Sequence, residues 1–166
     1  MAPPEGTARR VPPPWQIDHR RASTTARNHR TGRRVVRSMI DETVKQLASG
    51  PNFATLSTLM PDGQPQTQVM WVDADDTHVL INTELGRQKW RNVERDPRVT
   101  VTVIDRENPY HYAEVRGRVS EVVRGPEVRA HIDALSNKYL GHDYDPAAIK
   151  TERVILRIEP SAVHTM

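Results

Sequence analysis

Short segments in which apolar and polar residues alternate recur along most of this chain, and they constrain its fold more than any other feature. Alternation with a period of two places successive side chains on opposite faces of a β-strand. Turn sequences separate the segments; in one of them, Pro61-Asp62-Gly63, the glycine can adopt the positive φ of a tight turn. The predicted strands are residues 53–59, 66–72, 78–83, 98–104, 110–123 and 153–158. Six antiparallel strands favour a small barrel, because closure of the sheet removes exposed edges.

Short helices are expected around these strands. Residues 38–50 and residues 125–140 each carry apolar side chains at near-helical spacing. Ser38 is a candidate cap for the first of these helices. A third, short helix is expected between Arg87 and Pro97, since proline cannot continue a helix.

The N-terminal part of the chain differs in composition from the rest. Residues 1–37 contain nine arginines and two acidic residues, hence a charge of +7, whereas the whole chain is +3, so that residues 38–166 are −4. This segment is rich in proline and too poor in large apolar residues to offset chain entropy by burial. We expect a disordered basic extension followed by one folded domain, 38–166. The extension could tether nucleic acid or membrane. Alternatively, it has no function, or translation begins later, at Val35, Val36 or Met39.

Several classes of protein are excluded or disfavoured. The chain has no cysteine, so neither disulfides nor thiolate metal sites can form, and its histidines lack metal-ligand spacing. No apolar run approaches the roughly twenty residues that span a bilayer, and no signal-peptide core is present, so we expect a cytoplasmic protein without a membrane partner. A nucleic-acid-binding barrel is disfavoured because residues 38–166 are net acidic and few strand aromatics could stack bases.

One stretch suggests a binding site. In NTELGRQKWRNVERDPRVTVTV, residues 82–103, Arg87 and Lys89 lie between the strand that ends near Thr83 and the short helix. The first N–H groups of a helix lack internal partners and lie at the positive end of its dipole. Two flanking cations would complete a site for the phosphate of a cofactor. Alternatively, both side chains are solvated surface charges that happen to open a helix.

Together with NPYHYAEVRGRV at residues 108–119 and TERVILRIEPSAV at residues 151–163, this stretch resembles the pyridoxamine 5′-phosphate oxidase-like split-barrel superfamily. The resemblance covers roughly residues 41–164, and it is to the branch that uses the deazaflavin coenzyme F420. It implies a mainly β fold with α: a six-stranded antiparallel split β-barrel, also called the FMN-binding split barrel, with flanking short helices.

The resemblance also implies where a cofactor would bind. Arg87 and Lys89, beside Thr83, would hold the ribityl-phosphate arm that F420 and FMN share. F420 has in addition a lactyl-oligoglutamyl tail with several carboxylates, which requires a basic exit groove. The candidate side chains for this groove are Arg91, Arg95, Arg116 and Arg118, which could equally be surface arginines.

The ring system would lie against the second predicted strand, near Gln68, Val69, Met70 and Trp71. Alternation alone explains these four residues equally well, as one face toward the barrel and one face outward. The outward face would then belong to a dimer interface.

The resemblance further implies a homodimer with two cofactor sites between the subunits. Tyr110 and Tyr112 would then reach the cofactor of the partner subunit, or would simply pack the interface.

The leading functional hypothesis is an F420-dependent oxidoreductase that transfers a hydride between reduced deazaflavin and a small unsaturated or aromatic substrate. Hydride transfer between carbons requires alignment and desolvation but little from a protein acid or base, so no catalytic residue is named. The alternatives are an FMN-binding oxidoreductase of the same fold and a non-catalytic F420-binding or carrier protein. No motif in the sequence identifies the substrate.

Overall fold

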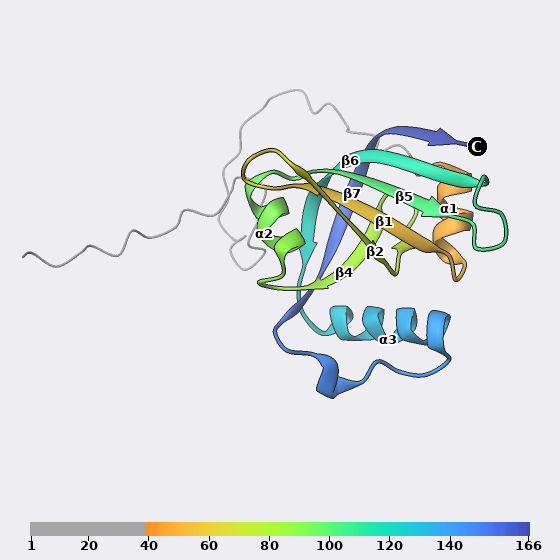
Figure 1. Cartoon of the computed structure of the whole chain (residues 1–166). Helices are drawn as coiled ribbons and strands as arrows, with labels where there is room; N and C mark the ends of the chain where they lie inside the picture. The colour runs from red at the N-terminus through yellow and green to blue at the C-terminus, as the bar shows by residue number, and fades with distance from the viewer. Residues whose placement is uncertain (1–38) are drawn as a thin grey trace, which may run out of the picture.

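The computed structural model describes residues 39–166 (Figure 1). Predictions for the preceding segment, including its disorder and the cap at Ser38, lie outside the described residues. Three α-helices are present in the described part, α1 (Glu42–Ser49), α2 (Gln88–Arg95) and α3 (Pro126–Leu140), with a 3-10 turn at Pro146–Ala148. The strands are β1 (Phe53–Leu59), β2 (Pro65–Met70), β3 (Asp73–Ala74), β4 (Val79–Glu84), β5 (Arg98–Ile104), β6 (Tyr112–Val123) and β7 (Arg153–Thr165). No described helix is long and apolar enough to cross a bilayer.

All seven strands form one curled antiparallel sheet in the order β2-β1-β5-β6-β7-β4-β3. The prediction of a mainly β split barrel with short helices is confirmed. The prediction of six strands was wrong by one, because the strand predicted at 66–72 ends at Met70 and a short additional strand, β3, follows at Asp73–Ala74. β2 pairs with β1, whereas β3 pairs with β4, so consecutive pieces of chain form the two edges of the sheet.

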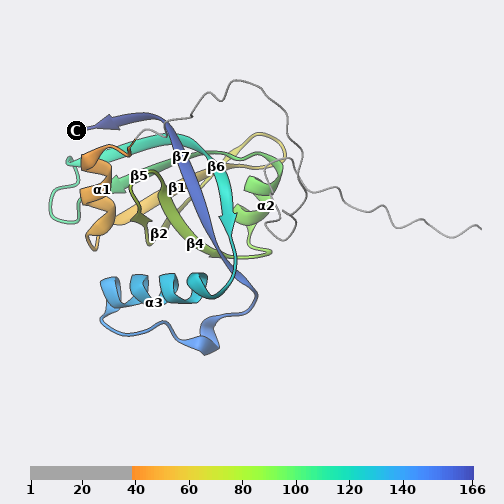
Figure 2. The ribbon, with the colours of Figure 1, turned by 180° about the vertical axis from the view of Figure 1, so that it is seen from behind.

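The interruption between β2 and β3 falls at Trp71 and Val72, and side chains of α3 satisfy the backbone of Val72. The Val72 N–H donates to the hydroxyl oxygen of Tyr139 at 3.2 Å, and the Val72 carbonyl accepts from Lys138 Nζ at 2.6 Å. A buried backbone group without a partner would be costly. α3 therefore replaces the ladder at the split of the barrel, and Figure 2 shows it lying along this side of the sheet.

The core fills the inside of the curled sheet. Alternate residues of β5 are buried, as the period-two pattern predicted, and they meet buried side chains of the other strands. α1 and α2 lie at opposite ends of the strands (Figures 1 and 2) and add Val44, Leu47, Trp90 and Val93 to the core. Both helices thus cover apolar openings of the barrel.

The first helix begins later than predicted. Asp41 caps α1, since its Oδ1 accepts from the N–H groups of Thr43 at 2.9 Å and Val44 at 3.4 Å. Met39 and Ile40 precede the helix despite their helical spacing. A carboxylate that satisfies the first free N–H groups fixes the helix start more strongly than apolar spacing does.

The last strand extends beyond its predicted end at residue 158, because β7 continues to Thr165. Proline has no N–H for a sheet ladder and is normally confined to edge strands, strand starts or bulges. Here Pro160 lies opposite Gly117, where the β6–β7 register shifts, so the missing donor falls at an irregularity.

Gly117 permits this close approach of β6 and β7. A Cβ at this position would lie 2.3 Å from the backbone oxygen of Glu159, and neither backbone can move without breaking the ladder. We expect Gly117→Ala to lower the free energy of unfolding by about 1–3 kcal/mol, as overpacking does. Arg116→Ala, an exposed neighbour in the same strand, should change it by less than about 0.5 kcal/mol. Urea denaturation measures both, and equal effects would refute this interpretation.

Candidate cofactor site at the junction of β4 and α2

The predicted anion site lies where β4 ends and α2 begins. Gly86, with φ of +79°, turns the chain, and Arg87 occupies the cap position of α2 in an extended conformation. Within residues 39–166, no side chain caps this helix. The first N–H groups of α2 therefore have no side-chain acceptor among the described residues, which suits an anionic ligand.

Lys89 is the cation of this site that forms no direct ion pair with a described residue. Its half-buried ammonium makes no ion pair within 4 Å in the described part of the chain, whereas Arg87 Nη2 lies 3.4 Å from Glu84 Oε1. Burial lowers the pKa of Lys89, and the nearby charges of Arg87 and Arg153 lower it further. A bound anion would offset both effects.

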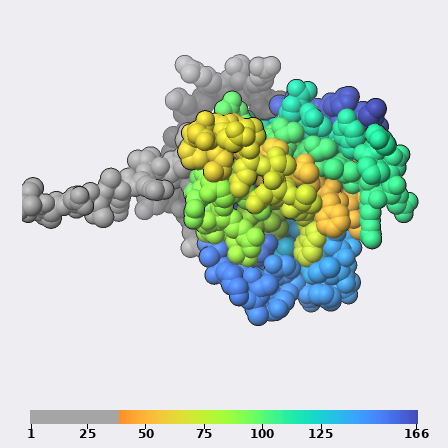
Figure 3. Space-filling view, in the orientation of Figure 1, coloured from red at the N-terminus to blue at the C-terminus, as the bar shows by residue number. Residues whose placement is uncertain are grey.

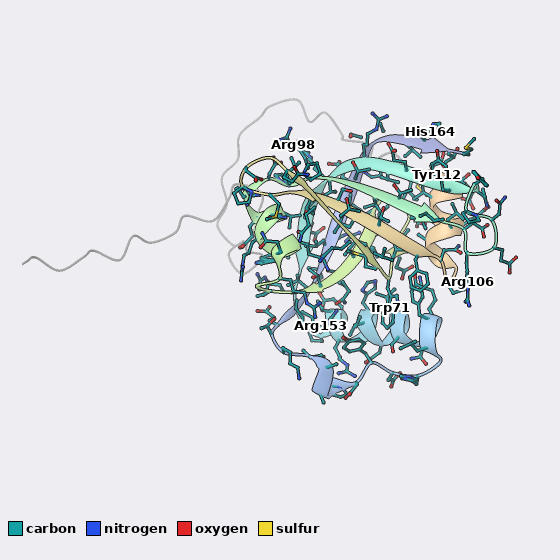
Figure 4. All side chains as sticks on the ribbon, viewed as in Figure 1. Trp71, Arg98, Arg106, Tyr112, Arg153 and His164 are labelled. Atoms are coloured by element: carbon teal, nitrogen blue, oxygen red, sulfur yellow. The ribbon has the colours of Figure 1, made fainter. Side chains whose placement is uncertain are left out.

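Arg153 is a third cation here, which the sequence analysis did not predict. It lies opposite Glu84 in the β4–β7 register, with its side chain only 10% exposed (Figure 4). Its Nε donates to Asn82 Oδ1 at 2.7 Å and its Nη1 donates to Glu84 Oε1 at 2.8 Å. Its guanidinium also lies over the ring of Tyr144 at 5.0 Å, and burial lowers its pKa. These contacts fix Arg153 in place, so its charge lies permanently beside the junction.

Thr83 precedes this cluster at the end of β4. Its hydroxyl oxygen is buried and has no hydrogen-bond partner among the described residues. A buried hydroxyl normally has a partner. The Thr83 hydroxyl is thus a buried group beside the junction whose hydrogen-bonding capacity no described residue uses.

A buried asparagine fixes α2 against the β1–β2 hairpin. Asn92 Nδ2 donates to Thr58 Oγ1 at 2.9 Å and to Gln66 Oε1 at 3.1 Å, and Asn92 Oδ1 accepts from Gln88 Nε2 at 2.9 Å. Trp90 and Val93 of the same helix are buried in the core. Packing and these hydrogen bonds therefore hold the start of α2 in one position.

The four residues predicted near a cofactor ring do not share one environment. Val69 is 68% exposed and Gln68 is exposed, whereas Met70 packs against the core. Trp71 stacks on Tyr139, with ring centroids 5.1 Å apart and an interplanar angle of 5°. Only Trp71 (Figure 4) is thus immobilised by another aromatic ring.

Tyr110 and Tyr112 lie far from Arg87 and Lys89 within one chain. Tyr110 is 80% exposed in the turn before β6, and the ring of Tyr112 lies 6.2 Å from that of His164 (Figure 4). Tyr112 pairs with Ile104 at the end of β5 that is remote from α2. One chain therefore does not unite all the predicted site residues.

The four arginines predicted to line a tail groove differ in their contacts. Arg95 donates to the Leu59 carbonyl. Two others form ion pairs, Arg116 with Glu114 at 3.3 Å and Arg118 with Glu159 at 3.2 Å. Arg91 is exposed and forms no ion pair with a described residue. Among residues 39–166 no three histidine, cysteine or carboxylate side chains come together as metal ligands.

The fold and this junction define a split-barrel protein with a cationic site between its fourth strand and second helix. The chain belongs to the pyridoxamine 5′-phosphate oxidase family, whose model matches residues 40–166.

Solved structures agree with this assignment. A structure described as an F420 reductase is 36% identical to this chain, with a TM-score of 0.67, and the match covers 76% of this chain and 100% of the other. A conserved hypothetical protein from Mycobacterium tuberculosis is 25% identical, with a TM-score of 0.55 and coverage of 77% and 85%. The heme storage protein HutZ from Vibrio cholerae, at 16% identity, a TM-score of 0.57 and coverage of 76% and 94%, shows the shared fold alone.

Proposed function

We propose that this protein is an F420-dependent oxidoreductase that transfers a hydride between reduced deazaflavin and a small unsaturated or aromatic substrate. The observation that carries the proposal is the β4–α2 junction, where Lys89 forms no ion pair with a described residue and lies beside a helix start without a side-chain cap in that part of the chain. Support comes from the 36% identity to an F420 reductase over the whole length of that chain.

The residues present at the junction fit the phosphate arm of such a cofactor. Arg87 and Lys89 would bind the phosphate through charge-assisted hydrogen bonds, and the Thr83 hydroxyl would add a neutral one. Trp71, with Gln68, Val69 and Met70 on the preceding strand, would border the ring. These are positions that can hold and orient a planar group and exclude water from it.

F420 supplies the hydride chemistry when it is bound. The chain then has to align donor and acceptor carbons and to keep the site dry, and neither task requires a titrating side chain. The fixed stack of Trp71 on Tyr139 offers a rigid apolar surface for alignment. We accordingly assign no catalytic residue.

We also propose a homodimer in which the partner subunit completes each site. Exposed Val69 and Tyr110 offer apolar surface for such a contact, and Tyr110 and Tyr112 are remote from the junction of their own chain. A cytoplasmic location is part of the same proposal.

Removal of an aromatic contact from the partner should weaken F420 binding. We expect Tyr110→Ala and Tyr112→Ala each to raise the Kd by about three- to tenfold, corresponding to roughly 0.5–1.5 kcal/mol for an aromatic contact. Fluorescence titration gives the Kd, and light scattering gives the assembly state. The far-ultraviolet circular dichroism of Tyr110→Ala should not change, since this side chain is 80% exposed within its own chain. A monomer that binds one F420 per chain would refute the shared site.

Absorption spectra of the purified protein test the cofactor. We expect added F420 to be retained through gel filtration and FMN to be lost. The second candidate is an FMN protein, which the site also favours because both cofactors carry a ribityl phosphate. Retention of yellow FMN in place of F420 would establish that candidate.

Turnover distinguishes an oxidoreductase from a carrier. Reduced F420 mixed with a panel of activated alkenes and quinones should be reoxidised faster with the protein than without it. F420 binding without acceleration across the panel would favour the carrier.

A further inference from the structure

Glu84 is a buried carboxylate in the middle of the proposed anion site. Its side chain is 4% exposed, and its Oε1 lies 2.8 Å from Arg153 Nη1 and 3.4 Å from Arg87 Nη2. Its charge also acts on Lys89. A group that repels phosphate thus contacts one of the two cations proposed to bind phosphate, and binding alone does not explain why it is there.

Stability of the sheet accounts for only one of these contacts. Glu84 and Arg153 are register partners on β4 and β7, and their ion pair compensates two charges that are both buried. Arg87 is 53% exposed and would be solvated without a partner. Because the Arg87 end of this contact stays half exposed, the contact with Glu84 contributes less to stability than the buried pair with Arg153 does, and it also sets the charge of the site.

Glu84 lowers that charge by one. Arg87, Lys89 and Arg153 are three cations around one carboxylate, hence a formal charge of +2 rather than +3. The repulsion between a carboxylate and a bound phosphate is proportional to the phosphate charge. The unfavourable contribution of Glu84 to the binding free energy is therefore about twice as large for a dianion as for a monoanion.

The two candidate cofactors differ in this respect. FMN ends in a phosphate monoester, which carries about −1.5 to −2 charges at pH 7. The phosphate of F420 joins the ribityl arm to the lactyl tail, and as a diester it carries one negative charge. We propose that Glu84 is a specificity-determining residue that biases the site toward the phosphodiester of F420 and against a monoester. This inference rests on the proposed function and adds a physical basis for the choice between two cofactors with a common arm.

Two probes that differ mainly in phosphate charge isolate the effect of that charge on binding. The 5′-phosphate of the F420 chromophore is a monoester, and its methyl ester is a diester with the same ring and the same arm. In Glu84→Gln, the ratio of monoester affinity to diester affinity should rise by about five- to tenfold relative to the unsubstituted protein. Glutamine keeps the shape and an acceptor for Arg153. Glu152→Gln is the matched control, because this carboxylate is exposed and pairs with Arg124 at 2.8 Å, and there the ratio should not change.

A second variant tests the opposite sign and does not disturb the buried pair. Gln88→Glu adds a carboxylate at the first residue of α2, where the helix dipole favours negative charge. It also removes the hydrogen bond from Gln88 Nε2 to Asn92 Oδ1, so its affinity ratio is compared with that of Gln88→Met, which loses the same donor without adding a charge. The affinity ratio should fall by a similar factor. Titrations on the full-length protein, with melting curves to verify folding, measure both variants.

The outcomes separate this inference from the proposal on which it rests. Opposite shifts of the ratio in the two variants support the role of Glu84. If the protein binds F420 but folded Glu84→Gln shows an unchanged ratio of monoester to diester affinity, that role alone is overturned. If Glu84→Gln does not fold, an unchanged ratio in Gln88→Glu gives the same result. A protein that binds neither probe nor F420 overturns the proposed function and, with it, this inference.

Discussion

Replacement of Arg153 by methionine is expected to lower the free energy of unfolding by about 3 kcal/mol. The substitution leaves Glu84 almost fully buried, with Arg87 at 3.4 Å as its remaining cation, and removes the donor to Asn82. Loss of one partner of a buried ion pair costs about 3–5 kcal/mol. The lower end applies because Arg87 compensates part of the charge. Chemical denaturation followed by circular dichroism measures the effect.

Two further variants show whether burial is the cause. Arg118→Met removes an exposed arginine that pairs with Glu159 at 3.2 Å across β6 and β7, and it should cost less than about 1 kcal/mol. The double variant Glu84→Leu with Arg153→Met should be more stable than Arg153→Met, because no uncompensated charge remains. Equal losses in Arg153→Met and Arg118→Met would show that the Arg153 pair is no stronger than a surface pair.

Local patterns in the sequence predict most of the strands, because strands such as β1, β4 and β5 place alternate residues in the core. β5 spans the predicted residues 98–104, and α2 ends just before Pro97 as proline requires. Where the side-chain pattern and a backbone requirement conflict, the backbone decides. Asp41 starts α1 against the apolar spacing of Met39 and Ile40, and the bulge at Gly117 lets β7 continue past Pro160.

The candidate site is predictable only as far as it is local in sequence. Thr83, Arg87 and Lys89 belong to one strand–helix junction, so sequence spacing alone places them together. Arg153 reaches the same junction because β7 pairs with β4, and this pairing of distant segments leaves no local signal. The stack of Trp71 on Tyr139 likewise depends on where α3 docks. In the space-filling view (Figure 3), the segments around α2 and those around α3 border one another despite their separation along the chain.

The largest expected effect on ligand binding concerns Lys89 and Arg87. A charge-assisted hydrogen bond to phosphate contributes roughly 1.5–3 kcal/mol, and about 1.4 kcal/mol corresponds to a tenfold change in affinity. Lys89→Ala and Arg87→Ala should therefore each weaken F420 by about ten- to a hundredfold. We expect Lys89→Ala to have the larger effect, since Arg87 shares its charge with Glu84 at 3.4 Å. Neither variant should unfold, because neither side chain belongs to the apolar core.

Arg91 provides the matched control, because it is exposed on the same helix and forms no ion pair with a described residue. A contact with the flexible tail of F420 would be solvated, so Arg91→Ala should weaken binding by well under tenfold. High salt should abolish this effect, since exposed charges are screened, whereas the loss in Lys89→Ala should persist. Titration of F420 at low and high salt measures all three variants. If Arg91→Ala weakens binding as much as Lys89→Ala, or if neither Lys89→Ala nor Arg87→Ala changes the affinity of a folded protein, the phosphate binds elsewhere.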